Sequence, residues 1–294
     1  MSGMLAAHYF RHLEPIILES QDSLPNNHTA LLRFRSGVVS DLTGIPFKKV
    51  KVQKMISFEG AHLIQPSLYL NNLYSNKVTG SVRSRSLGNL DDCERYIAPG
   101  DFISKLSKGL DIKYGQTVDD FDNAEDEPII STMPVYSLAK SLNYKDLPSL
   151  KSRPITTVSF DLSGDIDVFQ TVYYPSARNP FYRISITGKR VIAEFSEFSE
   201  DWDQEELLAG LLKIVELDFG ITGTLSNVNV SSQKYGKLIE CDTDAVKTFL
   251  GWATRKHNIY SLGRWGTHRQ LLMDDVVQDI KKIDRMIHNK GYNV

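Results

Sequence analysis

The sequence predicts a mixed α/β fold, in which helix–strand segments at both ends of the chain surround an inserted antiparallel β-sheet. Three observations predict it. A helix-forming segment precedes a short continuous apolar run at residues 16–18. Residues 155–195 alternate in polarity and are rich in β-branched and aromatic side chains, and amphipathic helix patterns follow at 203–215 and 274–287. At 294 residues, with 41% hydrophobic and 24% charged side chains, the chain is large enough for two domains.

The first twenty residues predict a helix and then a strand. Residues 4–7 are strong helix formers, and Pro15 ends that helix. The apolar run at 16–18 is typical of a strand buried in a parallel sheet. Glu19 follows at the carboxyl end of this strand, and a loop is expected at 25–27.

The segment from residue 30 to residue 54 is basic, since Asp41 is its only carboxylate. Valine and lysine alternate at 49–52, which predicts a half-buried strand, and for its lysines we favour a solvated edge. The stretch from there to Lys108 is rich in Asn, Ser and Tyr and is expected to be irregular. Residues 119–127 hold six carboxylates without the spacing of a calcium loop, so we expect a surface turn and no metal site.

The second half of the chain predicts a sheet and two helices. Four strand patterns separated by turn signals predict an antiparallel meander within 155–195. The next helix has Asp201 or Asp203 as its N-cap and a buried apolar stripe up to residue 215. The last helix is expected to begin near Asp274 and Asp275, with Gln278 completing a capping box.

Composition excludes several classes of protein. The formal charge of −2 argues against nucleic acid as a partner, although the basic segment keeps a nucleotide or a DNA base open as a weaker alternative. The two cysteines, Cys93 and Cys241, match neither a zinc knuckle nor a disulfide framework, which favours the cytoplasm. No apolar run reaches the roughly 18 residues that cross a bilayer. No catalytic motif of a hydrolase or a phosphate-binding loop is present.

The two ends of the chain together carry the strongest functional pattern. Residues 1–7 match the second half of a dinucleotide-binding fingerprint, with Ser2 and Gly3 at its third glycine, and Glu19 lies where a carboxylate accepts ribose hydroxyls. Near the other end, residues 260–277 predict a strand, a turn at Gly263 and Arg264, and a helix opened by Met273 and Asp274. A helix N-terminus offers free N–H groups and a positive dipole end to such a cofactor.

This far end resembles the C-terminal flavin-binding signature of the FAD-dependent UDP-galactopyranose mutases and amine-oxidase-like flavoproteins. Residues 129–134 and 180–184 resemble two further segments of that family, in the same order along the chain. The resemblance implies an FAD/NAD(P)-binding Rossmann-like domain formed by residues 1–60, 110–140 and 225–294. It implies an inserted substrate domain with an antiparallel sheet, formed by residues 61–109 and 141–224. Because the first strand and the first two glycines have no counterpart, the resemblance implies an N-terminally truncated form.

The resemblance also implies roles for individual residues. The cofactor would be FAD, bound by Ser2, Gly3, Glu19, Arg33, Arg35, Ser36, Gly263, Arg264, Met273 and Asp274. Arg264 would stabilise charge on the reduced flavin, and His268 would move a proton. Tyr182, Arg183 and Gln270 would bind a small polar, anionic substrate, because a guanidinium binds such groups in a bidentate manner.

The sequence departs from the mutases at Gln270, where the mutase motif has a tyrosine, and this favours a divergent flavoenzyme of the small, phage-encoded kind. A non-catalytic binding protein that has kept the fold is the alternative.

Overall fold

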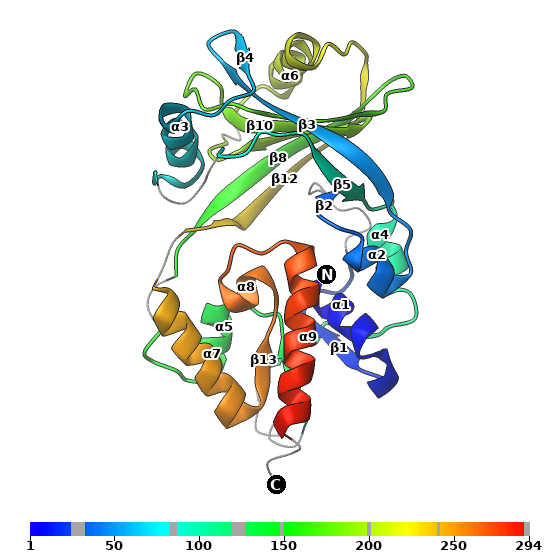
Figure 1. Cartoon of the computed structure of the whole chain (residues 1–294), viewed down its shortest axis with the longest axis vertical. Helices are drawn as coiled ribbons and strands as arrows, with labels where there is room; N and C mark the ends of the chain where they lie inside the picture. The colour runs from blue at the N-terminus through cyan, green and yellow to red at the C-terminus, as the bar shows by residue number, and fades with distance from the viewer. Residues whose placement is uncertain are drawn as a thin grey trace.

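The computed structural model describes residues 1–24, 33–82, 87–118, 127–147, 150–198, 201–239 and 242–290. The described chain has two regions, a large curled sheet and, below it in Figure 1, a group of helices with two small parallel sheets. The predicted mixed α/β class is confirmed by this arrangement. The helices are α1 (Ser2–Tyr9), η1 (Arg11–Leu13), α2 (Val38–Thr43), α3 (Leu68–Thr79), α4 (Phe102–Ser107), α5 (Val135–Ser141), α6 (Gln204–Phe219), α7 (Thr243–His257), α8 (Gly263–Thr267) and α9 (Met273–Lys290).

The large sheet has nine strands in the order β12-β8-β11-β10-β9-β3-β5-β2, with β4 paired to β3. Strands β9, β10 and β11 form an antiparallel meander, but β8 pairs with β11 and not with β9. The four-strand meander predicted within 155–195 is therefore wrong in order, because β8 lies beside the last of these strands, as in a Greek key. One face packs on α6 through a core of buried aliphatic and aromatic side chains. The strands are β2 (Arg33–Phe34), β3 (Lys48–Phe58), β4 (Ala61–Leu63), β5 (Cys93–Ile97), β8 (Ser152–Leu162), β9 (Val168–Tyr173), β10 (Phe181–Gly188), β11 (Arg190–Phe195) and β12 (Leu225–Leu238).

The lysines of the basic segment are solvated, as predicted, but the expected edge strand is wrong, because β3 lies between β9 and β5 in the sheet. In β3, Lys48, Lys49 and Lys51 pair with Asp167, Glu94 and Asp92 at 2.8, 2.7 and 3.0 Å. More than half of each lysine side chain is exposed. Because these charges are already paired with carboxylates, β3 offers little net positive field to a nucleic acid.

Two small parallel sheets lie among the helices. Strand β1 (Ile16–Glu19) pairs with β6 (Asp111–Tyr114), and β7 (Ile129–Ser131) pairs with β13 (Ile259–Ser261). Helices α1, α2, α4 and α9 contribute to the core on one side, while α5 and α7 pack on the β7–β13 pair from the other. The parallel direction of β1 was predicted correctly. Its burial was not, because only Ile17 joins the core while Ile16 and Leu18 are 62% and 51% exposed.

The stretch up to Lys108 is more regular than the sequence predicts. It contains α3, β5 and α4. Ser67 caps α3 by accepting a hydrogen bond from the backbone N–H of Leu70, and Gly80 ends the helix at φ +72°. Leu70, Tyr74 and Val78, spaced four residues apart, pack beneath the large sheet. The residues between them are rich in Asn and Ser, so the alternation of polar and apolar residues does not indicate a helix here.

The two C-terminal helix patterns are confirmed, with one correction. Asp203 caps α6 by accepting hydrogen bonds from the backbone N–H groups of Glu205 and Glu206 at 2.8 and 3.0 Å. Helix α9 begins at Met273, and the predicted capping partner Gln278 is wrong. Instead, the carboxylate of Asp275 accepts the backbone N–H of Leu272 at 2.8 Å, because position 275 is one helical turn after that N–H.

Some expectations fall on other parts of the chain. The loop at 25–27 and most of the acidic stretch 119–127 lie outside the described residues. The predicted cofactor domain includes β3 and β12, which pair with the large sheet here, and the domain boundaries stay a prediction. None of the described helices combines the length and the apolar character that a bilayer crossing requires. Within the described ranges, no group of three metal-ligating side chains comes together.

Candidate functional site

The two ends of the chain meet at the N-terminus of α1. Gly263 has φ +84°, and a Cβ added there would lie 2.7 Å from Ser2 Oγ. A Cβ added to Gly3 would lie 3.8 Å from the side chain of Thr132, the residue that follows β7. Segments more than 250 residues apart in sequence are therefore in contact, and glycine at position 263 is required by both its backbone angle and the close approach.

Glu19 also lies near the N-terminus of α1. Burial lowers the pKa of the Met1 amino group, whereas the negative charge of Glu19 raises it. The Glu19 carboxylate also accepts the backbone N–H of Gln21 at 3.0 Å, which fixes its orientation at the end of β1. We call Ser2, Gly3, Glu19, Thr132 and Gly263 the strand-end cluster. Glu19 ends β1, Thr132 follows β7, Gly263 comes shortly after β13, and Ser2 and Gly3 begin α1 beside them.

The strand-end cluster has the chemistry of a dinucleotide site. The first N–H groups of α1 have no partner within the helix, and the positive end of the helix dipole lies with them. Ligands of open parallel sheets bind at the carboxyl ends of the strands, which is where this cluster lies. A carboxylate that can accept hydrogen bonds from hydroxyls and a glycine that permits close approach are two of the groups that such a cofactor needs.

A second group of predicted residues gathers at the N-terminus of α9. The Asp274 carboxylate accepts the backbone N–H groups of Arg35 and Ser36 at 3.1 and 2.8 Å and the Ser36 hydroxyl at 2.8 Å. Arg35 pairs with Asp275 through its guanidinium. Met273, Asp274, Arg35 and Ser36 are therefore neighbours, and their roles toward a cofactor stay predictions. In this structure, Asp274 holds the turn at residues 35–36 against the helix.

Arg33 lies apart from both groups. Its guanidinium enters the large sheet, donating to the hydroxyls of Thr187 and Thr171 at 3.0 and 2.8 Å and to the carbonyl oxygens of Gln170 and Ile186. Burial, together with the nearby charge of Arg183, lowers its pKa to about 9. Within the described chain no carboxylate forms an ion pair with Arg33, so it adds positive charge to this face of the sheet.

Tyr182 and Arg183 meet on one carboxylate in the large sheet. The Tyr182 hydroxyl donates to Glu194 at 3.2 Å, and the Arg183 guanidinium pairs with the other oxygen of Glu194. Burial opposes the charge of Arg183, but Glu194 more than offsets it and raises the pKa of Arg183. The ammonium of Lys237 lies 5.3 Å from the centre of the Tyr182 ring.

Sequence reasoning missed Glu194. The signal was present, because residues 183 and 194 are opposite one another in the β10–β11 hairpin once its turn is placed at 188–189.

The remaining candidates join α8 to the end of β12. Arg264 donates to the carbonyl of Leu271 at 2.9 Å and closes the turn that follows α8. His268 Nε2 contacts the carbonyl oxygen of Ile239 at 3.3 Å, and Gln270 donates to the carbonyl of Leu238 at 3.1 Å. Burial lowers the pKa of His268. Their roles toward a cofactor or substrate stay predictions.

The fold resembles solved structures at low sequence identity. The chain superposes on reduced UDP-galactopyranose mutase with a TM-score of 0.67 and 12% identity, covering 98% of this chain and 92% of that one. A putative protoporphyrinogen oxidase from Exiguobacterium sp. 255-15 superposes with a TM-score of 0.62 and 13% identity, covering 98% of this chain and 97% of that one. An oxidoreductase from Methanosarcina mazei superposes with a TM-score of 0.56 and 10% identity, covering 97% of this chain and 98% of that one. No protein-family model matches the sequence, and neither does any curated protein. At these identities the likeness establishes the fold.

Proposed function

We propose that this protein is a flavin-dependent enzyme of the oxidoreductase or mutase type, with FAD bound at the strand-end cluster. The observation that carries the proposal is the contact between Ser2 and Gly263 beside Glu19, at the carboxyl ends of parallel strands. The fold likeness to a mutase, an oxidase and an oxidoreductase supports it. When bound, the flavin supplies the redox chemistry that amino-acid side chains lack.

The residues of this chain bind and orient the cofactor. The backbone N–H groups at Ser2 and Gly3 bind its phosphates, and the Glu19 carboxylate accepts hydrogen bonds from its ribose. The turn at residues 35–36, Met273 and Asp274 lie beside the N-terminus of α9, whose positive dipole end favours negative charge. Arg264 contributes a fixed cation near the same helix.

The substrate in this proposal is a small polar anion bound at Tyr182, Arg183 and Gln270. Arg183 is held in place by Glu194 and keeps 20% of its side chain exposed, while Arg33 adds a second positive charge nearby. His268 moves a proton in this proposal. With Nε2–H donating to Ile239, its Nδ1 carries the lone pair that accepts a proton.

A further parallel strand completes the cofactor site in this proposal. Strand β1 pairs only with β6, and β7 only with β13, within the described ranges. Helix α1 contacts both β1 and β7 and begins at the carboxyl ends of the strands. In a parallel sheet, a strand leading into such a helix lies between the two strands that the helix touches. It would also cover part of the exposed surface of Ile16 and Leu18.

The test is a visible absorption spectrum after incubation with FAD and gel filtration. Two proteins are compared, the chain as it stands and a version with a Gly-containing apolar strand fused before Met1. We expect the fused protein to retain flavin bands. Glu19→Ala should weaken FAD affinity about tenfold, since a hydrogen bond to a charged group contributes about 1.5–3 kcal/mol. The exposed Glu205→Ala serves as the matched control. If neither protein retains flavin, the proposal fails.

A further inference from the structure

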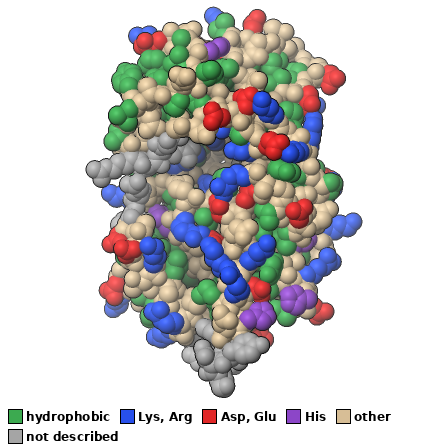
Figure 2. All heavy atoms as spheres, in the orientation of Figure 1, with side chains coloured by type: hydrophobic (Ala, Val, Ile, Leu, Met, Phe, Trp, Pro, Cys, Tyr) green, Lys and Arg blue, Asp and Glu red, His purple; other side chains and the backbone are tan. Residues whose placement is uncertain are grey.

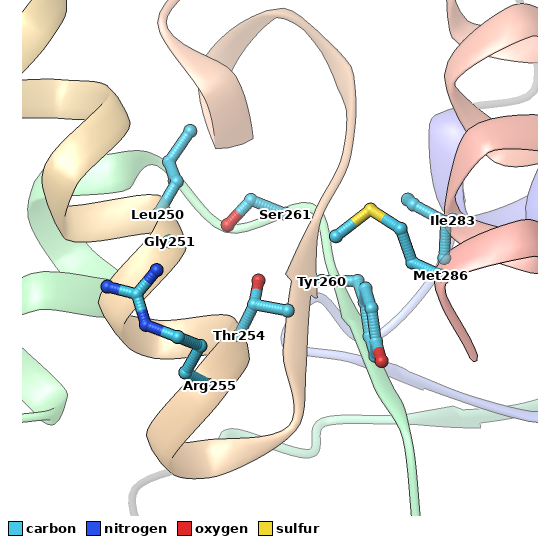
Figure 3. A pocket seen from close by; sticks show the side chains of 8 residues that line it. All are labelled: Leu250, Gly251, Thr254, Arg255, Tyr260, Ser261, Ile283 and Met286. Atoms are coloured by element: carbon cyan, nitrogen blue, oxygen red, sulfur yellow. The ribbon is translucent and has the colours of Figure 1, made fainter. Parts of the chain in front are cut away.

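A pocket of about 290 Å³ lies between α7, β13 and α9, and no residue of the strand-end cluster lines it (Figure 3). Residues of all three elements line it: Leu250, Gly251, Thr254, Arg255, Tyr260, Ser261, Ile283 and Met286. It follows the edge of β13 that faces away from β7, and no strand pairs with that edge in the part of the chain that the structure describes. The pocket therefore lies beside this sheet edge, where the carbonyl of Ile259 accepts a hydrogen bond from the Thr254 hydroxyl at 2.9 Å.

The walls of the pocket are mainly apolar. Leu250 lines it from α7, and Ile283 and Met286 line it from α9. In Figure 3 the Met286 side chain points from α9 toward β13. Met286 is 47% exposed, although methionine is among the residue types that are most often buried. Such a surface favours a ligand with a short hydrocarbon portion.

Ser261 places polar groups at the floor of the pocket. The N–H of Leu262 donates to Ser131 at 2.8 Å, and the N–H of Ile129 donates to Asn258 at 3.1 Å. Alternate residues of β13 thus face β7, so the N–H of Ser261 points away from β7, toward the pocket. The Ser261 hydroxyl is buried and has no hydrogen-bond partner in the described ranges. An unsatisfied buried hydroxyl is costly and indicates a missing partner.

Arg255 adds a positive charge at the rim. A Cβ added to Gly251 would lie 3.3 Å from Arg255 Nη1, so the guanidinium folds back over Gly251 along α7. Figure 3 shows it beside that glycine. Among the described residues Arg255 forms no ion pair, whereas Lys247 and Lys282 pair with Asp244 and Asp279. Lys and Arg side chains gather over the lower half of the face in Figure 2, where α7 and α9 lie.

We propose that this pocket binds a small monocarboxylic acid with a short unbranched hydrocarbon chain. The carboxylate is bound by the Arg255 guanidinium and by the N–H and hydroxyl of Ser261, because charge-assisted hydrogen bonds are the strong ones. The hydrocarbon chain packs on Met286, Ile283 and Leu250. A neutral alcohol of the same length would leave Arg255 without its counter-charge. This site is independent of the flavin proposal, since none of its residues belongs to the strand-end cluster.

The experiment uses hexanoate as the probe and the methionine methyl groups as reporters. The protein is labelled with ¹³C at the methionine methyls, and the Met286 signal is assigned from Met286→Leu. We expect hexanoate to shift the Met286 signal in a saturable manner, while 1-hexanol at the same concentration does not. Arg255→Gln should weaken binding about tenfold, the loss of a hydrogen bond to a charged group. Lys256→Gln, the neighbouring exposed cation outside the pocket, should bind as the unaltered protein does.

The internal control is Met55, which packs in the core between the large sheet and α6 and should not shift. An unchanged Met55 signal also establishes that each variant is folded. Equal shifts with hexanoate and 1-hexanol, or an unchanged affinity in Arg255→Gln, would show that the carboxylate is not recognised and would overturn the proposal. The same conclusion would follow if Arg255→Gln altered only stability, because Arg255 would then serve the C-terminus of α7 alone.

Discussion

Glu194 accepts hydrogen bonds from two side chains that the sequence places in a substrate site. Tyr182 and Arg183 both reach it, and it is 12% exposed while Arg183 is 20% exposed. A carboxylate so placed neutralises one buried guanidinium and leaves the charge of Arg33 uncompensated by any described ion pair. The orientation of Arg183 therefore depends on a residue eleven positions away on the neighbouring strand.

Glu194→Gln should destabilise the protein by about 3 kcal/mol, because it leaves a buried guanidinium without its counter-charge. Urea denaturation followed by circular dichroism measures this. The matched control is Glu197→Gln, since Glu197 is 84% exposed and pairs with Arg153 only at 3.5 Å. A surface pair of this kind contributes less than about 1 kcal/mol. Equal effects from the two variants would contradict the role given to Glu194.

At the scale of elements, helix α6 depends on its N-cap. The carboxylate of Asp203 accepts two backbone N–H groups in the first turn of α6. Asp203→Ala should lower the free energy of unfolding by about 1 kcal/mol, the usual value of a cap. Asp203→Asn should cost much less, because asparagine caps helices about as well. Thermal denaturation of the two variants distinguishes the cap from a general effect of charge, and a similar loss in both would contradict it.

The junction of α8 with α1 depends on Gly263. Gly263→Ala introduces both a strained backbone angle and a Cβ 2.7 Å from Ser2 Oγ, so its cost should exceed about 1 kcal/mol. Gly44→Ala is the control, because Gly44 has φ +69° and open space around the added Cβ. Adding Ser2→Gly to Gly263→Ala should recover part of the loss. No recovery in this double variant would show that the two segments do not press on one another.

At the scale of the whole molecule, the turn after α8 joins the helical region to the large sheet. His268 and Gln270 bind the backbone at the end of β12, and the rings of Trp265 and Tyr235 lie 5.9 Å apart. These contacts link a loop at residues 264–271 to the strand that leads out of the sheet. A change in the charge of His268 would act directly on this junction.

His268 predicts a loss of stability in mild acid. Burial lowers its pKa below the ordinary value of 6.5, so the unfolded chain binds the proton more readily than the folded one. Stability should therefore fall as the pH drops through 6.5 and level off below the folded pKa. His268→Gln should reduce the difference in unfolding free energy between neutral and mildly acidic buffer. His12→Gln, which replaces an exposed histidine, should leave that difference unchanged. Equal pH dependence in all three proteins would contradict this origin.

Much of the fold followed from local pattern. The strands of the meander, the caps of α6 and the start of α9 are set by side chains within a few residues of one another. From the sequence, Gly3 and Gly263 were expected to approach a cofactor closely, whereas the close approach of Gly263 to Ser2 is a finding of the structure. Helix α3 was missed, since only three of its buried positions carry large hydrophobic side chains, and their periodicity is too weak to stand out among polar neighbours.

The sequence by itself determined the mixed α/β class and the order of most elements. Tertiary structure alone decided which partners the arginines take and which apolar residues stay exposed. Arg33 bonds to residues 137 or more positions away, and Ile16 and Leu18 are exposed because no described residue covers their face. The physical reason is that periodicity and caps record local burial, whereas long side chains and sheet edges find their partners only when distant segments pack together.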